Sequence, residues 1–392
     1  MSDLIRQSQD ANAVFSRNTD MEPADLMATP VIGSIAYSCA PNKQYALPVS
    51  TPAFNTIIEF ELPKAYLSEM YVSFTLGAFT SGSYCLYPGL ALIQRVELIS
   101  GTETIQQFDY APTTHMCLSR LSTAQITQVL ESAGGTSFAS GTCIAPLPLF
   151  FTRFGNPGKI RNAEYVEPLN NRLVNGKLRL RLTLRTAAAV AAAGATVGSP
   201  TIAARLYYLT YTVPSAIQEI HMSNRESYVY RAYDFVTLSP GTSVAAGTNT
   251  TFDLKSLVGS LADLFITTTT AASITANTYY LTVDEIDFLE VFVDGQSYWR
   301  TDQQESLAFD KWLLSEVPGK ASVINSPYVV PFEITRDPAM YTGALESNGI
   351  TSLTITLNHS NGGANPANVT YAFGSTVNAA IYIEGDSFKR QR

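Results

Sequence analysis

The sequence IQRVELISGTETI, residues 93–105, predicts a strand, a tight turn and the start of a second strand. Its apolar residues flank a glutamate, and Ser100-Gly101 then supplies the positive φ that a hairpin turn needs. Residues 286–298, IDFLEVFVDGQSY, repeat this arrangement with Asp294-Gly295 at the turn. The two stretches therefore predict two hairpins of the same design in one chain.

Similar segments follow each hairpin. Residues 115–132 and 304–317 both place apolar side chains at helical spacing, and each is followed by a strand that contains proline and bulky apolar residues. A chain of 392 residues also exceeds what one hydrophobic core usually organises. Many strands and few helices indicate an all-β protein made of two antiparallel sandwiches.

Prolines and composition changes divide the chain into five parts. The predicted parts are an N-terminal arm (1–50), a first sandwich (51–213), a helical connector (214–227), a second sandwich (228–388) and a basic C-terminal tail (389–392). The arm contains a weak helical stripe followed by four spaced prolines, so we expect it to gain order by lying on another surface.

Charged residues make up only 15% of the chain, against roughly 25% in soluble domains. A low charge content is typical of surface that becomes buried between subunits. The alternative is a polar surface rich in Thr, Ser and Asn. The net charge of −8 argues against nucleic-acid binding by the protein surface as a whole, because phosphate binding needs clustered Lys and Arg.

The sequence predicts neither export nor membrane insertion. Residues 1–15 mix charged and apolar side chains, unlike a secretory signal, and no stretch approaches about 18 strongly apolar residues. We expect synthesis without export and reduced, buried thiols at the four cysteines, Cys39, Cys85, Cys117 and Cys143.

Several stretches together resemble the double-jelly-roll major capsid proteins of tailless icosahedral DNA viruses. That lineage includes the nucleocytoplasmic large DNA viruses, virophages, tectivirus-like phages and adenovirus hexon. Residues 92–105 resemble the first-barrel hairpin of the family, and APLPLFFTR at 145–153 resembles its Pro-Leu-x-Phe-x-Phe strand. Residues 331–335, 342–345 and 353–357 resemble a second-barrel pattern. Each motif is weak alone, but they occur in the family's order over residues 50–385.

This resemblance implies two tandem eight-stranded jelly rolls with short helices in the loops and an extended N-terminal arm. It implies a homotrimer whose six barrels form a pseudo-hexagonal capsomer in an icosahedral virion shell. Its partners would be neighbouring capsomers, penton proteins and minor capsid proteins. The arm would lie beneath the capsomer, nearer the genome or an internal membrane. The resemblance implies a structural protein without catalysis, cofactor or sequence-specific nucleic-acid binding.

The clearest strand is residues 177–185, where leucines alternate with Lys177, Arg179, Arg181 and Arg185. These cations could meet phosphates, or carboxylates such as Asp284, Glu285, Asp287 and Glu290 across a barrel or subunit seam. We interpret Arg179, Arg181 and Arg185 as candidate assembly contacts. Phe388, beside the basic tail, is a further candidate that would anchor the tail to a neighbouring subunit.

The sequence contains no motif that requires catalysis or a metal. The carboxylates of residues 284–294 alternate along a strand, whereas a calcium site needs oxygens converging from a tight loop. A glycosidase pair there is an open alternative. His115, His221 and His359 are far apart, so we expect no zinc site. The rival functions are a receptor- or carbohydrate-binding β-sandwich spike and a β-sandwich hydrolase, which scarce histidine and the lack of a nucleophile motif disfavour.

Overall fold

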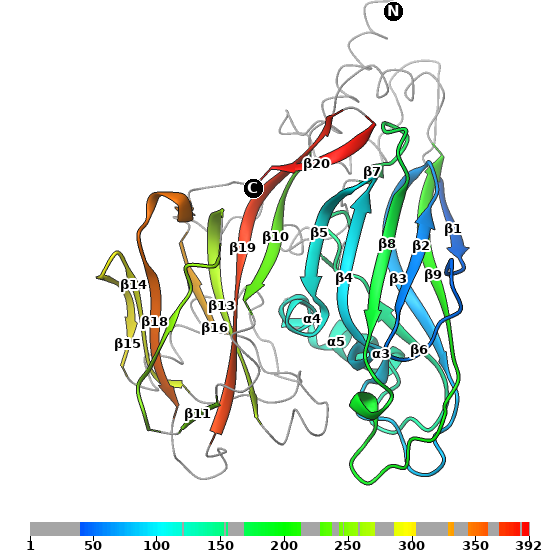
Figure 1. The fold of residues 1–392 in the computed structure, drawn as a ribbon, viewed down its shortest axis with the longest axis horizontal. Helices are drawn as coiled ribbons and strands as arrows, with labels where there is room; N and C mark the ends of the chain where they lie inside the picture. The colour runs from blue at the N-terminus through cyan, green and yellow to red at the C-terminus, as the bar shows by residue number, and fades with distance from the viewer. Residues whose placement is uncertain are drawn as a thin grey trace, which may run out of the picture.

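The chain folds into two β barrels that stand side by side (Figure 1). The structure is a computed structural model. It describes residues 40–119, 121–152, 154–155, 168–212, 228–236, 243–245, 247–257, 259–270, 286–302, 328–332, 344–359, 368–384 and 386–391.

The first barrel consists of two antiparallel sheets. One contains, in spatial order, β1 (Ala40–Ala46), β9 (Ile202–Thr212), β3 (Tyr66–Leu76) and β6 (Gly141–Pro146), with β7 (Leu169–Asn170) paired to β3. The other contains β2 (Ile57–Leu62), β8 (Leu178–Leu184), β4 (Ile93–Ser100) and β5 (Glu103–Asp109). Consecutive strands alternate between the sheets except at the β4–β5 hairpin and between β6 and the two-residue strand β7, so both sheets enclose one core.

The second barrel repeats this order of strands. One sheet contains β10 (Tyr228–Val236), β19 (Asn368–Glu384), β13 (Ser260–Thr270) and β16 (Tyr328–Pro331), with β11 (Ser243–Ala245), β17 (Leu345–Glu346) and β20 (Ser387–Gln391) attached. The other contains β12 (Thr250–Asp253), β18 (Leu353–His359), β14 (Ile286–Val293) and β15 (Gln296–Thr301). In each barrel the strands that begin and end the unit are neighbours. The predicted fold of two eight-stranded jelly rolls is confirmed.

Both predicted hairpins are present. In the first, Gly101 between β4 and β5 has a φ of 60°. In the second, Asp294 and Gly295 between β14 and β15 have φ values of 49° and 76°, so both turn residues adopt the left-handed conformation of a type I′ turn. That turn suits the right-handed twist of the strands, and Asp and Gly tolerate it with little strain.

The alternation along residues 177–185 is also confirmed. Within β8, Leu178, Leu180, Leu182 and Leu184 are all buried, whereas the intervening side chains are half-buried on the opposite face. The leucines belong to the core of the first barrel, together with side chains of the opposite sheet such as Val72 and Phe74. Burying these apolar side chains between two sheets is the main favourable term in the stability of this barrel.

The helical segments differ from the prediction. The single helix predicted over residues 115–132 is two helices, α4 (Tyr110–Ser119) and α5 (Thr123–Ser132). Ser122 begins α5 as its N-cap and exchanges hydrogen bonds with Gln125 in a capping box, which restarts the helix after a break. The sequence analysis also missed a short helix, α3 (Pro88–Leu92), and the 3₁₀ turns Ala188–Val190 and Ser347–Gly349.

Part of the predicted arm and part of the predicted tail form strands in the structure. Residues 40–46 of the predicted arm form β1, an edge strand where Pro41 is tolerated because one side of the strand makes no ladder hydrogen bonds. Lys389, Arg390 and Gln391 of the predicted tail lie in β20, paired with β19. The helical connector predicted at 214–227 and the helix predicted at 304–317 lie outside the described residues.

Asp294 connects the second hairpin to the strand beside it. Its Oδ1 accepts hydrogen bonds from the backbone N–H of Ser352 (2.9 Å), the hydroxyl of Thr351 (2.8 Å) and the backbone N–H of Thr351 (2.6 Å). The bond from Ser352 and then those from Thr351 lower the pKa of the Asp294 carboxyl below its usual value.

We therefore expect Asp294→Asn to destabilise the second barrel at neutral pH, because the asparagine keeps the turn but loses the charge. A lowered pKa in the folded state contributes stability above the unfolded pKa of about 4 and loses it as pH falls through the folded value. Thermal melts of both proteins between pH 7 and pH 2.5 should converge toward the acid end. An equal difference in melting temperature at both ends would contradict this role.

Candidate assembly surfaces

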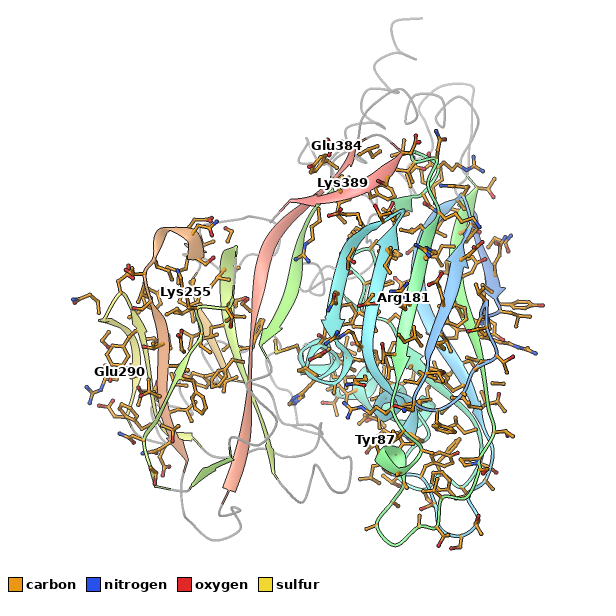
Figure 2. All side chains as sticks on the ribbon, in the orientation of Figure 1. Tyr87, Arg181, Lys255, Glu290, Glu384 and Lys389 are labelled. Atoms are coloured by element: carbon orange, nitrogen blue, oxygen red, sulfur yellow. The ribbon has the colours of Figure 1, made fainter. Side chains whose placement is uncertain are left out.

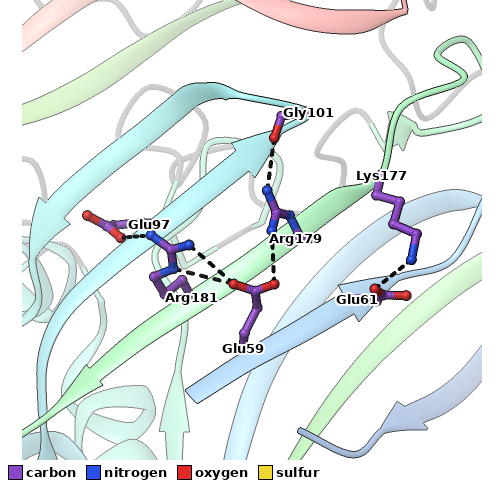
Figure 3. A network of polar contacts seen from close by, with 7 residues as sticks. All are labelled: Glu59, Glu61, Glu97, Gly101, Lys177, Arg179 and Arg181. Atoms are coloured by element: carbon purple, nitrogen blue, oxygen red, sulfur yellow. Dashed lines mark hydrogen bonds and ion pairs between the residues drawn. The ribbon is translucent and has the colours of Figure 1, made fainter. Parts of the chain in front are cut away.

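The basic stripe of β8 pairs with carboxylates of the two neighbouring strands (Figure 3). Arg181 lies directly across from Glu59 on β2 and Glu97 on β4, and its guanidinium nitrogens lie 3.3 and 3.5 Å from their carboxylate oxygens. Arg179 lies 3.2 Å from the second oxygen of Glu59 and donates to the carbonyl oxygen of Gly101 at 2.9 Å. Glu59 thus bridges two arginines on the outer face of the sheet.

These contacts correct the predicted partners. Glu59 and Glu97 of the same sheet pair with Arg179 and Arg181, whereas the notion of partners in the second unit rested on Asp287 and Glu290 and on two residues, 284 and 285, outside the described part of the chain. Alternating leucines place the cations outward, and pairing with β2 and β4 places glutamates in the same rows. Arg185 is half-buried at the end of this stripe, where its backbone N–H donates to the carbonyl of Leu92. A further role of Arg179, Arg181 and Arg185 at a subunit contact stays a prediction.

Glu59→Gln should lower the free energy of unfolding by about 1 kcal/mol, because a partly screened carboxylate that bridges two arginines is worth slightly more than an isolated surface pair. Glu61→Gln is the matched control, since Glu61 pairs with Lys177 where both side chains are at least half exposed. Urea denaturation at low and at 1 M salt measures both effects, and salt should reduce the first. Equal effects of the two substitutions would contradict the network.

The last strand of the second barrel reaches onto the first barrel, as Figure 1 shows for β20 above β5 and β4. The backbone N–H of Phe388 donates to the hydroxyl of Ser100 at 3.0 Å, and the carbonyl of Asp386 accepts from the N–H of Gly176 at 2.7 Å. Lys389, labelled in Figure 2, lies 3.4 Å from Glu103 of β5. Two of these contacts, those of Phe388 and Lys389, join sequence positions almost 290 residues apart.

Phe388 was expected to contact a neighbouring subunit, but its ring is only 1% exposed and packs into the first barrel's core. Ile381 of β19 belongs to the same core and Ile383 packs against it. The sequence identified Phe388 as an anchor but assigned it to the wrong partner, because a short-range pattern gives no information about which sheet a terminal strand reaches. The residue fastens the two barrels of one chain.

A second contact joins the barrels through α4. Met116 and Cys117 of this helix form a buried cluster with Phe265 of β13, and Val329 of β16 packs against it. Phe265 projects from the sheet away from the core of the second barrel, which contains Leu264 and Ile266 on either side of it. The outer face of the second barrel's β13–β16 region is therefore covered by the first barrel.

Phe388→Ala should lower the free energy of unfolding by about 3–5 kcal/mol, as for other buried phenylalanines, and should loosen β20 from the first barrel. The control is Lys389→Ala, which removes a half-exposed ion pair and should cost at most about 1 kcal/mol. Urea denaturation measures the stability, and limited proteolysis measures release of β20. A Phe388→Ala protein as stable and as protease-resistant as the control would contradict the fastening role.

The corresponding outer face of the first barrel is exposed and carries aromatic and basic side chains. Tyr45, Tyr207 and Tyr71 form one row across β1, β9 and β3. The rings of Tyr71 and Tyr207 stack with centroids 5.2 Å apart, and Lys43 Nζ lies within 5.4 Å of both. Arg205 lies 5.8 Å from the ring of Tyr45, which is 59% exposed. We call Lys43, Tyr45, Tyr71, Arg205 and Tyr207 the tyrosine face.

The tyrosine face was not predicted from the sequence. A signal was present, since the tyrosines occupy alternate outward positions of their strands, but the strands are distant in sequence and their register was needed. A side-chain hydrogen bond to Tyr71 raises the pKa of the Lys43 ammonium. Lys43 is therefore held as a cation over the two rings.

The described residues contain little that suggests a metal site or a catalytic nucleophile. Among them, no three His, Cys, Asp or Glu side chains gather as metal ligands, and no helix is both long and apolar enough to cross a membrane. The thiols of Cys85, Cys117 and Cys143 are buried, as expected, and Cys39 lies outside the described residues. Burial raises the pKa of Cys85 and of Cys143 to about 12, so neither is a nucleophile at neutral pH.

Among the residues that the structure describes, the histidines lie apart and two of the acidic residues have partners within the protein. His115 is buried in α4, His221 lies outside the described residues, and His359 ends β18. Glu290 accepts a hydrogen bond from the hydroxyl of Ser297 at 2.6 Å on the outer edge of the second barrel. Asp294 accepts the hydrogen bonds from Thr351 and Ser352 described above. Glu290 and Asp294, two of the acidic residues of 284–294, therefore have partners within the protein.

Comparison with solved structures extends the description of the fold. VP54 of the virus PBCV-1 is similar over 92% of this chain and 98% of its own, with a TM-score of 0.68 and 13% identity. The chain has the double-jelly-roll fold of viral major capsid proteins. The Faustovirus major capsid protein gives a TM-score of 0.61 at 11% identity over 97% of this chain and 98% of its own.

A third similar structure is that of the Sputnik virophage, with a TM-score of 0.59 and 11% identity over 95% of this chain and 92% of that one. No protein-family model and no curated protein sequence matches the chain. The likeness is thus one of architecture across almost the whole chain, with little conserved sequence.

Proposed function

We propose that this protein is a major capsid protein that forms homotrimeric, pseudo-hexagonal capsomers tiling an icosahedral virion shell. The observation that carries the proposal is the pair of jelly rolls with the same strand order, fastened side by side in one chain. Solved structures with this arrangement over nearly their full length are viral capsid proteins.

The geometry suits a tile. Three copies of a two-barrel chain present six similar barrels, which allows close packing with six neighbours in a shell built from one kind of subunit. The barrels are joined by β20 and by α4, so each copy contributes two barrels in a fixed relation. Low overall charge favours the burial of the sides of such a tile. Obligate contacts of this type bury on the order of 2,000 Å² or more.

The function needs no catalysis, cofactor or sequence-specific nucleic-acid binding. Its partners under this proposal are further copies of the chain, neighbouring capsomers, and the penton and minor capsid proteins of a virion. The N-terminal arm would face the genome or an internal membrane beneath the tile. The location would be the virion, after synthesis in the host cytoplasm.

The tyrosine face bears on the rival function, a carbohydrate-binding spike. Sugar-binding platforms are open aromatic faces, but Lys43 lies over the rings of both Tyr71 and Tyr207. Because the Lys43 side chain lies over these rings, the tyrosine face suits a contact with protein better than the stacking of a sugar ring.

The deciding experiment is the size and shape of the purified full-length protein. Sedimentation should give a trimer, and electron microscopy of the same sample should show particles with a hexagonal outline. A stable monomer, or an elongated particle that binds glycans on an array, would contradict the capsid function.

A further inference from the structure

The contact between the two barrels of one chain uses a different side of each barrel. The first barrel contributes the edge strand β5 and the helix α4 that follows it. The second barrel contributes β10 and the outer face around Phe265 of β13. The junction is therefore directional: the hairpin edge of one jelly roll meets the outer face of the other jelly roll's opposite sheet.

Each barrel has both surfaces, because the strand order is the same in both. In the second barrel, β15 occupies the edge position that β5 occupies in the first. In the first barrel, β1, β9 and β3 form the face that β10, β19 and β13 form in the second. Among the described strands, neither β15 nor β1 takes part in the contact between the barrels, and Figure 1 shows β15 and β1 at opposite ends of the molecule.

Exposed aromatic side chains mark both of these ends. On the first barrel, Tyr45 is 59% exposed, and Leu47 and Val49 directly after β1 are 61% and 66% exposed. On the second barrel, Tyr298 of β15 is 49% exposed, with its ring 5.3 Å from that of Phe332. Large apolar side chains this exposed at the ends of a low-charge protein are typical of a surface that another protein covers.

The charges of the two ends are opposite. The β14–β15 hairpin and the residue after it carry one arginine, Arg300, and four carboxylates: Asp287, Glu290, Asp294 and Asp302. We call this segment the acidic hairpin. Figure 2 shows Glu290 at the end of the second barrel far from the first. The tyrosine face carries Lys43 and Arg205, which are both exposed. Opposite charges favour a contact in one orientation.

We propose that the acidic hairpin of one copy packs against the tyrosine face of a second copy, repeating between chains the contact that joins the barrels within a chain. This inference rests on the proposed function, because it states how the copies of the capsomer hold together. The contact is head-to-tail: each copy offers one hairpin and one face, and a ring closes when the last hairpin meets the first face.

Reversing the character of the tyrosine face tests the proposal. Tyr45→Glu combined with Arg205→Glu changes two exposed side chains, so the barrel should fold, but it places two carboxylates opposite the acidic hairpin. We expect the concentration at which half of the trimers dissociate to rise at least about tenfold, as for loss of a central aromatic contact. Tyr382→Glu is the matched control, since Tyr382 is also exposed but lies outside the tyrosine face.

Sedimentation of the three proteins separates the outcomes. A wild-type trimer with a weakened double variant and an unaffected control supports the inference. A wild-type trimer with an equally stable double variant overturns the inference and leaves the proposed function standing. A wild-type monomer overturns the proposed function itself.

A second measurement needs no disruptive variant. Carbodiimide joins a lysine amine to a carboxylate in direct contact, so a trimer reassembled from ¹⁴N- and ¹⁵N-labelled chains should give mixed-isotope crosslinks between Lys43 and the acidic hairpin. Lys43→Arg keeps the charge and should abolish these crosslinks. Crosslinks from Lys43 only to other segments would overturn the inference.

Discussion

A β-sheet has two faces, and in the second barrel both are apolar in the middle of β13. Leu264 and Ile266 point into the barrel core, while Phe265 between them points out and is nonetheless fully buried. An outward phenylalanine at that position requires a cover, because exposing it to water would forgo the free energy of its burial. The helix α4 of the first barrel provides the cover. The two jelly rolls therefore stay together as one body.

Much of the architecture follows from short-range pattern. Gly101 and the pair Asp294-Gly295 fix two hairpins, and the leucine alternation of β8 fixes which face of that strand is buried. Such features depend on neighbours within a few residues, which a sequence displays directly. The order of these pieces, compared with the capsid family, then gave the two jelly rolls that the structure contains.

The candidate contacts depended on long-range pairing, and there the sequence was a weaker guide. The partners of Arg181 became known only once β8 lay between β2 and β4. The row of Tyr45, Tyr207 and Tyr71 arises from the register of three strands that are far apart in the chain. Phe388 was recognised as an anchor, but its destination is set by the path of β20 across the first barrel.

The position of β20 after the whole of the second barrel has a consequence for biosynthesis. Domains generally fold as units in the order in which the ribosome releases them. The first barrel can close as soon as β9 has emerged, but Phe388, which belongs to its core, follows all the other strands of the second barrel. A nascent polypeptide that has released only the first jelly roll therefore leaves the place of the Phe388 ring unfilled, and the core of that unit is completed only after its partner has been synthesised.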